Sequence, residues 1–116
     1  MTVQFIKELL NARVLAGNEI LDREVYTACG SDMMSDVLAF VKDQAVLLTG
    51  LVNPQVVRTA EMMDMRCIVF VRSKLPTDEM LALAEEAGIV VMTTPLRMFE
   101  ACGILYSGGL GKTENL

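Results

Sequence analysis

The chain contains no histidine and no tryptophan, and only three cysteines and three prolines among its 116 residues. Without histidine, a serine or cysteine nucleophile lacks its usual general base, which argues against a hydrolase triad. Cys29, Cys67 and Cys102 are far apart and have no CxxC spacing, so the sequence predicts no metal site and no cofactor. We expect reduced thiols that pack as small apolar side chains in a cytoplasmic protein.

Positive charge is also scarce, because the chain has ten Lys and Arg residues against fifteen Asp and Glu residues, which gives a net charge of −5. No basic cluster is present, so nucleic acid is not an expected partner. No apolar run is long enough to span a membrane, and Lys7 and Glu8 argue against a signal peptide. The chain is nevertheless 53% hydrophobic. Apolar area that a small domain cannot bury is usually covered by a partner, so we expect a homodimer.

Three consecutive segments repeat one pattern, and they are Ala45–Met63, Arg66–Ala87 and Ile89–Leu105. Each contains a short apolar run, a polar loop with Thr or Ser, a capping residue and an amphipathic helix. Continuous apolar runs that alternate with helices are typical of a parallel sheet buried on both faces. We expect strands at Ala45–Leu48, Cys67–Val71 and Ile89–Met92, and helix caps at Asn53, Thr77 and Thr94.

The first half predicts further elements of the same kind. We expect a helix from Thr2 to near Asn11, strands at Arg13–Ala16 and Val25–Cys29, and a helix capped by Ser31 or Asp32. The whole chain, residues 1–116, is therefore predicted to be one three-layer α/β/α domain with a mostly parallel sheet of four to five strands. Its core is expected to span about residues 13–106, with 107–116 as a flexible tail.

Polar residues follow each strand of the repeated pattern, at the sheet edge where open α/β sheets usually bind ligands. Helix-start amides, hydroxyl groups and cationic side chains suit an anion such as phosphate or carboxylate. The predicted ligand-binding residues are Thr49, Gly50, Asn53, Arg72, Ser73 and Thr94. The alternative is that the caps only stabilise helices and that Arg72 and Lys74 are solvated loop charges.

Three other groups of residues suggest further chemistry. The ending 108–113 resembles a phosphate-binding P-loop, but Tyr106 stands where that motif requires a glycine, so we reject it. The group Asp22-Arg23-Glu24 offers a carboxylate beside an arginine, but such groups commonly tie down a loop. Met62 and Met63 are adjacent and therefore cannot both face the same layer, so we expect at least one to point toward a partner subunit.

Several separate segments resemble the DRTGG-domain family, and together they cover roughly residues 13–110. They are Val14–Asn18, Leu21–Val25, Asp32–Phe40, Leu47–Leu51 with Asn53–Val56, Ile68–Arg72, and Met98–Leu105. Asp22-Arg23 and Thr49-Gly50 match parts of the family name, while Leu51 follows where a second glycine is expected. The family also resembles the N-terminal domain of HPr kinase/phosphorylase, which lacks that enzyme's P-loop.

This resemblance implies a stand-alone copy of a regulatory module of the kind found beside catalytic or nucleotide-sensing domains. We therefore expect a non-catalytic homodimer that senses a small anionic or nucleotide-type effector, docks a partner enzyme, or does both. One alternative is a purely structural adaptor with no small ligand. A more distant alternative is an enzyme that uses Asp22 or Asp32 as a base.

Overall fold

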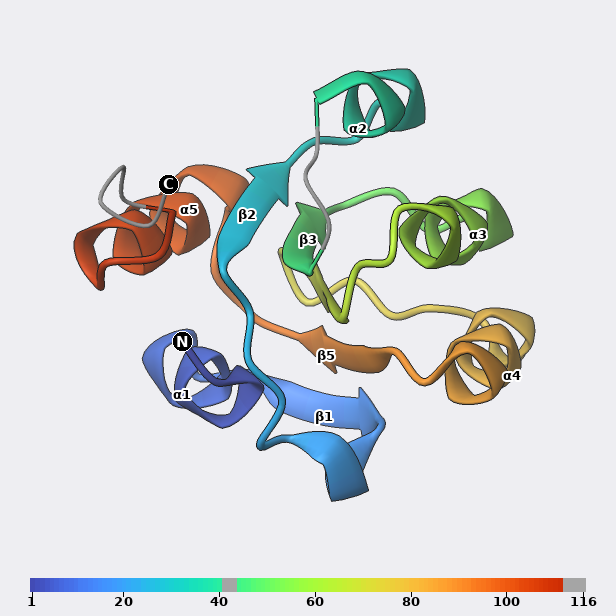
Figure 1. Cartoon of the computed structure of the whole chain (residues 1–116), viewed down its shortest axis with the longest axis horizontal. Helices are drawn as coiled ribbons and strands as arrows, with labels where there is room; N and C mark the ends of the chain where they lie inside the picture. Colours follow the sequence, from blue (N-terminus) through green and yellow to red (C-terminus); the bar gives the residue numbers. More distant parts are fainter. Residues whose placement is uncertain (41–43, 112–116) are drawn as a thin grey trace.

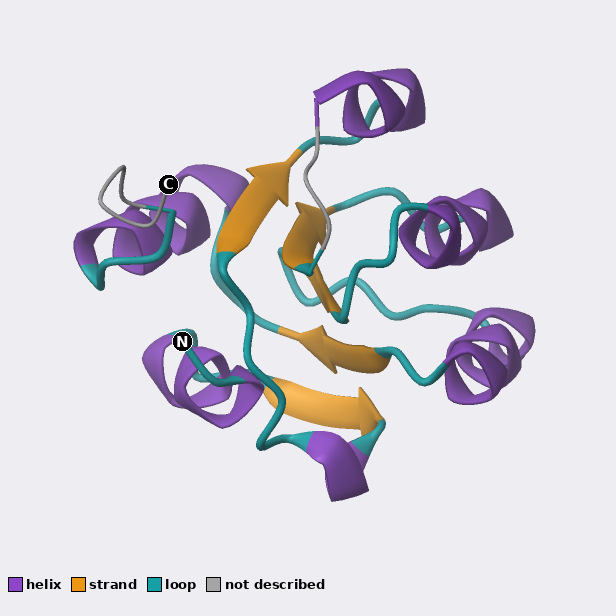
Figure 2. Ribbon diagram, in the orientation of Figure 1, coloured by secondary structure: helices purple, strands orange, loops and turns teal. Residues whose placement is uncertain are grey.

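A five-stranded sheet with the strand order β1-β5-β4-β3-β2 forms the centre of the computed structural model, which describes residues 1–40 and 44–111 (Figures 1 and 2). The strands are β1 (Arg13–Ala16), β2 (Thr27–Gly30), β3 (Ala45–Thr49), β4 (Cys67–Phe70) and β5 (Val90–Thr93). The helices are α1 (Val3–Leu9), α2 (Met34–Phe40), α3 (Pro54–Met62), α4 (Asp78–Ala87) and α5 (Met98–Ser107), with a 3₁₀ turn at Asn18–Ile20.

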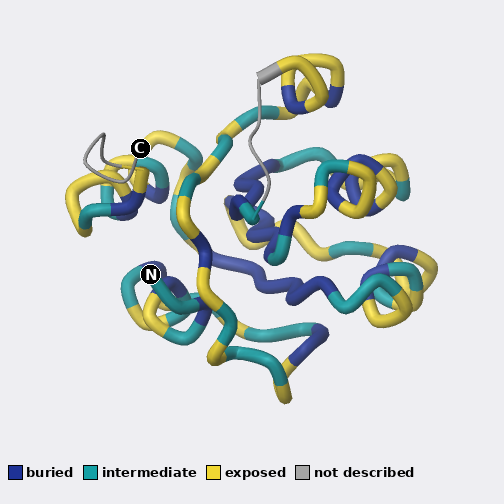
Figure 3. The backbone as a smooth tube through the Cα atoms, viewed as in Figure 1, coloured by how far each residue is buried: buried dark blue, intermediate teal, exposed yellow. Residues whose placement is uncertain are grey.

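Four strands are parallel, and only β1 runs antiparallel, against β5. The α/β fold with a mostly parallel sheet is therefore confirmed. All residues of β3, β4 and β5 are buried, as their continuous apolar sequences predict (Figure 3). The strand β2 begins two residues later than predicted and ends one residue later, at Gly30.

The helices cover both faces of the sheet (Figure 1). Side chains of α2, α3 and α4 form one apolar cluster with the sheet, and side chains of α1 and α5 form the other. The connections β2–α2–β3, β3–α3–β4 and β4–α4–β5 thus use the same face, whereas α5 crosses to the opposite face. The helix after β4 covers one face of the sheet and the helix after β5 covers the other, so the ends of these two strands form a topological switch point. Ligands of open α/β sheets bind at such a point.

Three predicted helix caps are confirmed. Backbone amides of the first turn donate to the side-chain oxygens of Thr2, Asn53 and Thr77, at 3.1, 2.8 and 3.2 Å. The predicted cap at Thr94 is wrong, because α5 begins only at Met98. Its first turn is instead closed by Glu100, which accepts a hydrogen bond from the Arg97 amide at 3.3 Å.

The C-terminal segment differs in part from the predicted flexible tail. Ser107 is the last residue of α5, and Leu110 is 95% buried in the cluster shared with α1. The amide of Leu110 donates to the Leu105 carbonyl, a bond typical of a helix C-terminus. The segment therefore packs against α1 as far as Leu110, while residues 112–116 lie outside the described part.

All three cysteines are free thiols, and burial raises the pKa of each one. The effect is largest for Cys67, which is fully buried in β4. The expected packing of the thiols as small apolar groups therefore agrees with their environments. Across residues 1–40 and 44–111, no group of three or more Cys, Asp or Glu side chains is arranged to hold a metal ion. No helix in these same ranges is long and apolar enough to cross a membrane.

The buried thiol of Cys67 predicts a specific loss of stability in alkali. Its pKa in the folded state lies above the ordinary value of 9.0, so the unfolded chain ionises first as the pH rises. The protonated thiol therefore makes its full contribution to the free energy of unfolding below pH 9. Above pH 9 this free energy falls, with a slope that approaches about 1.4 kcal/mol per pH unit. Urea unfolding between pH 8 and pH 10 measures this slope. The matched variant Cys67→Ala should show a shallower alkaline slope, and an identical slope would contradict the assignment.

Candidate functional site

The loop after β3 contacts a negatively charged side chain of the protein itself, the carboxylate of Asp32. The Thr49 hydroxyl and the Gly50 amide both donate to one carboxylate oxygen of Asp32, at 2.9 and 2.8 Å. Thr49 Oγ1 also accepts a hydrogen bond from the Leu51 amide at 3.1 Å. Asp32 therefore ties the end of β2 to the end of β3. It does not cap α2, although a cap at Asp32 was one of the two predicted options. Ser31, the other option, accepts from the Met33 amide at 3.0 Å.

The loop after β4 contains two consecutive non-glycine residues in the left-handed region. Arg72 and Ser73 both have φ of 57°, a conformation that costs side-chain-bearing residues energy and occurs often at functional sites. Their amides donate to the carbonyl groups of Leu96 and Thr94, at 2.8 Å each. These two hydrogen bonds hold the loop against the segment that leads into α5.

The side chain of Arg72 reaches back toward β3. A Cβ atom added to Gly50 would lie 2.5 Å from Arg72 Nη2, so the glycine leaves room for the guanidinium group. Arg72 is exposed and forms no ion pair with another described residue. The structure thus brings Thr49, Gly50 and Arg72 together, with Asn53 at the start of α3 nearby in the same loop.

Thr94 is fully buried, and its hydroxyl group is already in use. It donates to the Leu10 carbonyl at 2.6 Å and accepts from the Leu96 amide at 3.3 Å. Thr94 therefore links the end of α1 to the segment between β5 and α5. The buried Thr94 side chain thus supports this edge of the sheet from inside the protein.

A cavity of about 380 Å³ opens at the switch point between the ends of β4 and β5. It is lined by Asn11, Arg13, Ser73, Leu75, Thr93, Thr94 and Pro95. No carboxylate is among the lining residues, and Arg13 is an exposed cation without an ion pair among the described residues. Hydroxyl, amide and guanidinium groups without a competing negative charge can bind an oxyanion.

Of the six residues predicted to bind a ligand, Ser73 and Thr94 line this cavity, and the other four lie outside it. Asn11 and Arg13 were not predicted, because the sequence does not reveal which strand lies beside β5. The antiparallel register sets Arg13 opposite Thr93 and so brings the start of β1 to the carboxyl end of β5. No local pattern of the sequence reveals this pairing.

The charged group Asp22-Arg23-Glu24 has structural contacts. Arg23 donates to the Gly88 carbonyl at 2.6 Å and so caps the C-terminal end of α4. Glu24 pairs with the α-amino group of Met1 at 3.0 Å. Arg23 and Glu24 thus tie the loop to α4 and to the start of α1, which agrees with the structural interpretation of the motif.

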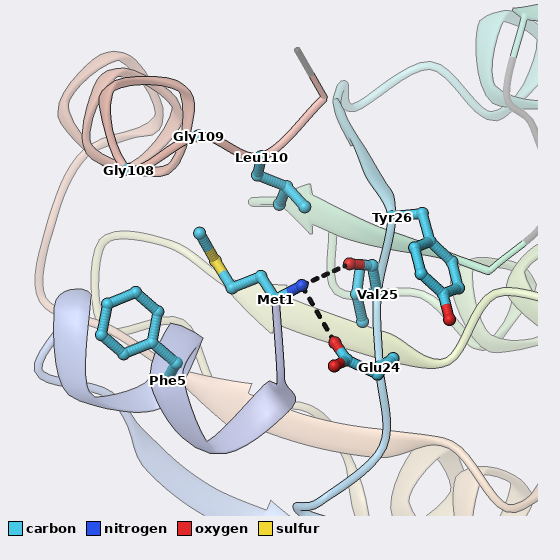
Figure 4. Close-up of a pocket in the computed structure, with 8 residues that line it drawn as sticks. All are labelled: Met1, Phe5, Glu24, Val25, Tyr26, Gly108, Gly109 and Leu110. Carbon is cyan, nitrogen blue, oxygen red and sulfur yellow. Dashed lines mark hydrogen bonds and ion pairs between the residues drawn. The ribbon is translucent and has the colours of Figure 1, made fainter. Parts of the chain in front are cut away.

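A second, larger cavity of about 580 Å³ lies near the start of β2, away from the predicted edge (Figure 4). It lies between α1, the end of α5 and the segment 24–26, with Phe5 and Tyr26 among its lining residues. Its two charged groups, the Met1 amine and the Glu24 carboxylate, neutralise each other. This cavity therefore presents mainly apolar and aromatic surface.

The model of one protein family, the DRTGG domain, matches residues 5–107. The chain belongs to the DRTGG-domain family. Among curated proteins, none matches this chain. Four chains of solved structures match it. One is the crystal structure of the CBS and DRTGG domains of the regulatory region of Clostridium perfringens pyrophosphatase, in complex with its activator diadenosine tetraphosphate.

The similarity to the pyrophosphatase region concerns the fold. The TM-score is 0.74 at 17% sequence identity, over 90% of this chain. The match covers 45% of the pyrophosphatase chain, so this DRTGG-domain chain spans less than half of that regulatory region. The family and the α/β architecture expected from the sequence are both confirmed by these comparisons.

Proposed function

We propose that this DRTGG-domain chain is a non-catalytic regulatory module of the cytoplasm, and that it acts as a homodimer. It senses a small anionic or nucleotide-type effector and passes its bound state to a partner enzyme. Family membership supports a regulatory role, and the similar pyrophosphatase region is itself regulatory and binds a dinucleotide activator. The observation that carries the proposal is the cavity at the switch point, whose lining includes the Arg13 guanidinium group and the Ser73 hydroxyl group and no carboxylate.

The effector site is centred on this cavity. Ser73 and Arg13 lie in its lining and provide a hydroxyl and a guanidinium group for a phosphate or carboxylate. Arg72 and Lys74 stand beside Ser73 as exposed cations without ion pairs among the described residues, and they add attraction for a second anionic group. Thr49, Gly50 and Asn53 form the adjoining rim, and Thr94 holds the wall of the cavity in place.

The same geometry provides a route by which binding affects the rest of the molecule. The Arg72 amide holds the Leu96 carbonyl, and α5 begins two residues after Leu96. An effector that contacts Ser73 acts on the loop whose amides set the position of this segment. We propose that effector binding fixes the start of α5, because three hydrogen bonds join residues 72–74 to residues 93–96 and a shift of the loop is passed to this segment.

Thermal unfolding with a panel of anions tests the proposal. The panel contains adenine nucleotides, dinucleoside polyphosphates, acetyl phosphate, phosphate and citrate. A ligand at about 100 times its dissociation constant adds about 2.7 kcal/mol, which raises the melting temperature of a domain of this size by several degrees. Arg13→Gln and Arg72→Gln should each abolish most of the shift, since each removes a cation from the site.

Arg58→Gln is the matched control for this experiment. Arg58 lies in α3 and pairs weakly with the exposed Glu79 at 3.9 Å, so its loss also removes one positive charge. It should leave the effector shift intact. A shift reduced equally by all three substitutions would indicate only general charge attraction, and no shift with any compound into the millimolar range would contradict effector sensing.

The alternative function is a structural adaptor that docks another protein and binds no small ligand. It is favoured by the large apolar side chains that the fold leaves exposed, among them Met62 at 73% and Phe99 at 88%. The adaptor requires no response to anions. Capture of a partner enzyme that is equally efficient in wild type and in Arg72→Gln, together with the absence of any thermal shift, would favour it.

A further inference from the structure

The cavity at the switch point combines one charged group with two unused polar groups. Among the described residues that line it, Arg13 is the only charged one, and its guanidinium group has no hydrogen bond or ion pair there. The side chains of Asn11 and Ser73 likewise form no hydrogen bond with another described residue. The three side chains offer a guanidinium fork, an amide and a hydroxyl group to a ligand. The polar part of the cavity therefore fits a single anionic group.

The two threonines of the lining have no hydrogen atom left to donate. The Thr93 hydroxyl group donates to the Lys74 carbonyl at 2.8 Å, and the Thr94 hydroxyl group donates to the Leu10 carbonyl at 2.6 Å. Each hydroxyl group has only one hydrogen atom, so both can only accept a further hydrogen bond. The side-chain donors for an anion therefore belong to β1, to the residues just before it and to the loop after β4.

Two exposed apolar side chains complete the lining. Leu75 is 55% exposed, and Pro95 is also exposed. The antiparallel register sets Arg13 opposite Thr93, so their side chains share one face of the sheet. The Thr93 hydroxyl group binds the Lys74 carbonyl, which places the next residue, Leu75, beside this pair. A ligand whose anionic group contacts Arg13 can therefore cover Leu75 with an apolar chain, and this burial favours binding.

The backbone of the polar lining is fixed before a ligand arrives. Asn11 and Ser73 have φ of 50° and 57°, in the left-handed region. The Asn11 amide donates to the Glu8 carbonyl at 3.3 Å, and the Ser73 amide donates to the Thr94 carbonyl at 2.8 Å. Strained backbone conformations of this kind cluster at ligand-binding positions. Because these residues are already in place, binding does not have to order their backbone, which favours affinity for a small ligand.

The volume of the cavity limits the size of its ligand. At about 380 Å³ it is near the lower end of the range of small-molecule sites. With about 30 Å³ for each water molecule, it has room for about a dozen water molecules, and therefore for a ligand of about a dozen non-hydrogen atoms. A mononucleotide exceeds this size, and a dinucleotide exceeds it several-fold.

We infer that this cavity binds a small aliphatic carboxylate, with the carboxylate on Arg13 and the aliphatic chain on Leu75 and Pro95. The inference rests on the effector site of the proposed function and names the chemical class of its ligand. The guanidinium fork matches the two oxygens of a carboxylate, and the side chains of Ser73 and Asn11 can donate to the same group.

Two related classes of ligand fit the lining less well. A phosphate monoester carries a charge of about −1.5 to −2 at neutral pH, against the one cation of the described lining. An α-amino acid carries an ammonium group next to its carboxylate. That ammonium group would lie near Arg13, with no carboxylate in the described lining to pair with it.

Thermal unfolding of the full chain at increasing concentrations of isocaproate and of acetate tests the inference, since the concentration dependence gives both dissociation constants. The two compounds share the carboxylate, and only isocaproate has a branched aliphatic chain. Each buried methylene group changes the affinity about fourfold, so acetate should bind at least about tenfold more weakly. Leucine, which is isocaproate with an α-ammonium group, should also bind at least about tenfold more weakly.

Leu75→Ser should weaken isocaproate binding about tenfold and leave acetate binding unchanged, because only the longer chain reaches this side chain. Arg13→Gln should abolish the binding of both. Leu38→Ser is the matched control, since Leu38 is 42% exposed on α2, which follows β2 at the opposite edge of the sheet from β1 (Figure 1). It should bind isocaproate as wild type does. All three positions are exposed, so circular dichroism should show an unchanged fold.

Equal affinities for acetate and isocaproate would overturn the inference, and so would a Leu75→Ser variant that binds isocaproate like the wild type. The same titration with phosphate and adenosine monophosphate separates the inference from the proposed sensing role. A response to either compound that is lost in Arg13→Gln, without any response to isocaproate, supports effector sensing and overturns the carboxylate assignment. No response to any compound into the millimolar range would overturn both.

Discussion

Phe70→Ala is expected to destabilise this DRTGG-domain chain by about 3–5 kcal/mol, since the substitution removes a large core side chain and leaves a cavity. Phe70 is the largest of the fully buried side chains and ends β4, one of the central strands. It lies in the cluster between the sheet and helices α2, α3 and α4. A loss of this size is a large fraction of the roughly 5–15 kcal/mol that holds a domain folded.

The consequence extends to the candidate site, because β4 leads directly into the Arg72–Ser73 loop. The Phe70 carbonyl accepts the Thr94 amide at 2.9 Å, so disorder at this position loosens the wall of the cavity. Urea unfolding at one fixed protein concentration measures the loss. Met62→Ala is the control, since an exposed substitution should stay within about 0.5 kcal/mol of wild type. Equal effects of the two substitutions would contradict the assigned core.

Thr94→Val is expected to cost about 1–3 kcal/mol, although valine has nearly the same shape as threonine. The hydroxyl group of Thr94 is fully buried and serves two backbone groups, the Leu10 carbonyl and the Leu96 amide. Without it, the buried Leu10 carbonyl and the partly buried Leu96 amide each have one hydrogen bond fewer. The substitution should also weaken effector binding, because Leu10 precedes the cavity residue Asn11 and the Leu96 carbonyl accepts the Arg72 amide.

Thr94→Ser separates the hydroxyl group from the methyl group. Serine keeps both hydrogen bonds and loses only the methyl group, so it should bind the effector as wild type does. Thermal unfolding and effector titration of the two variants provide the comparison. A valine variant with wild-type stability and affinity, beside a weakened serine variant, would show that packing and not the hydroxyl group holds this segment.

The strands and most helices could be predicted from the sequence because their signals are local. A continuous apolar run such as Ala45–Thr49 fits only a strand buried on both faces, and Asn53-Pro54 is a strong helix start. Thr94-Pro95 has the same local signal, and there the prediction was wrong. The Thr94 hydroxyl group is engaged by Leu10, 84 residues away in the sequence, and the helix begins at Met98.

The site could be predicted only in part, for the same physical reason. The carboxyl ends of parallel strands meet at one edge, so the sequence places Arg72, Ser73 and Thr94 in one neighbourhood. The presence of Asn11 and Arg13 depends on the antiparallel pairing of β1 with β5, which no local pattern reveals. The contact of Asp32 with Thr49 and Gly50 likewise depends on the pairing of β2 with β3.

The most direct test of effector sensing is a two-dimensional amide NMR titration with the anion that gives the largest thermal shift. We predict that the amide signals of residues 11–13, 72–73, 93, 94 and 96 move most, with smaller changes along α5. Their movement should saturate with one effector per chain and be lost in Arg13→Gln. Shifts confined to the second cavity, around Phe5, Tyr26 and Gly109, or no shifts at millimolar concentration, would contradict the account.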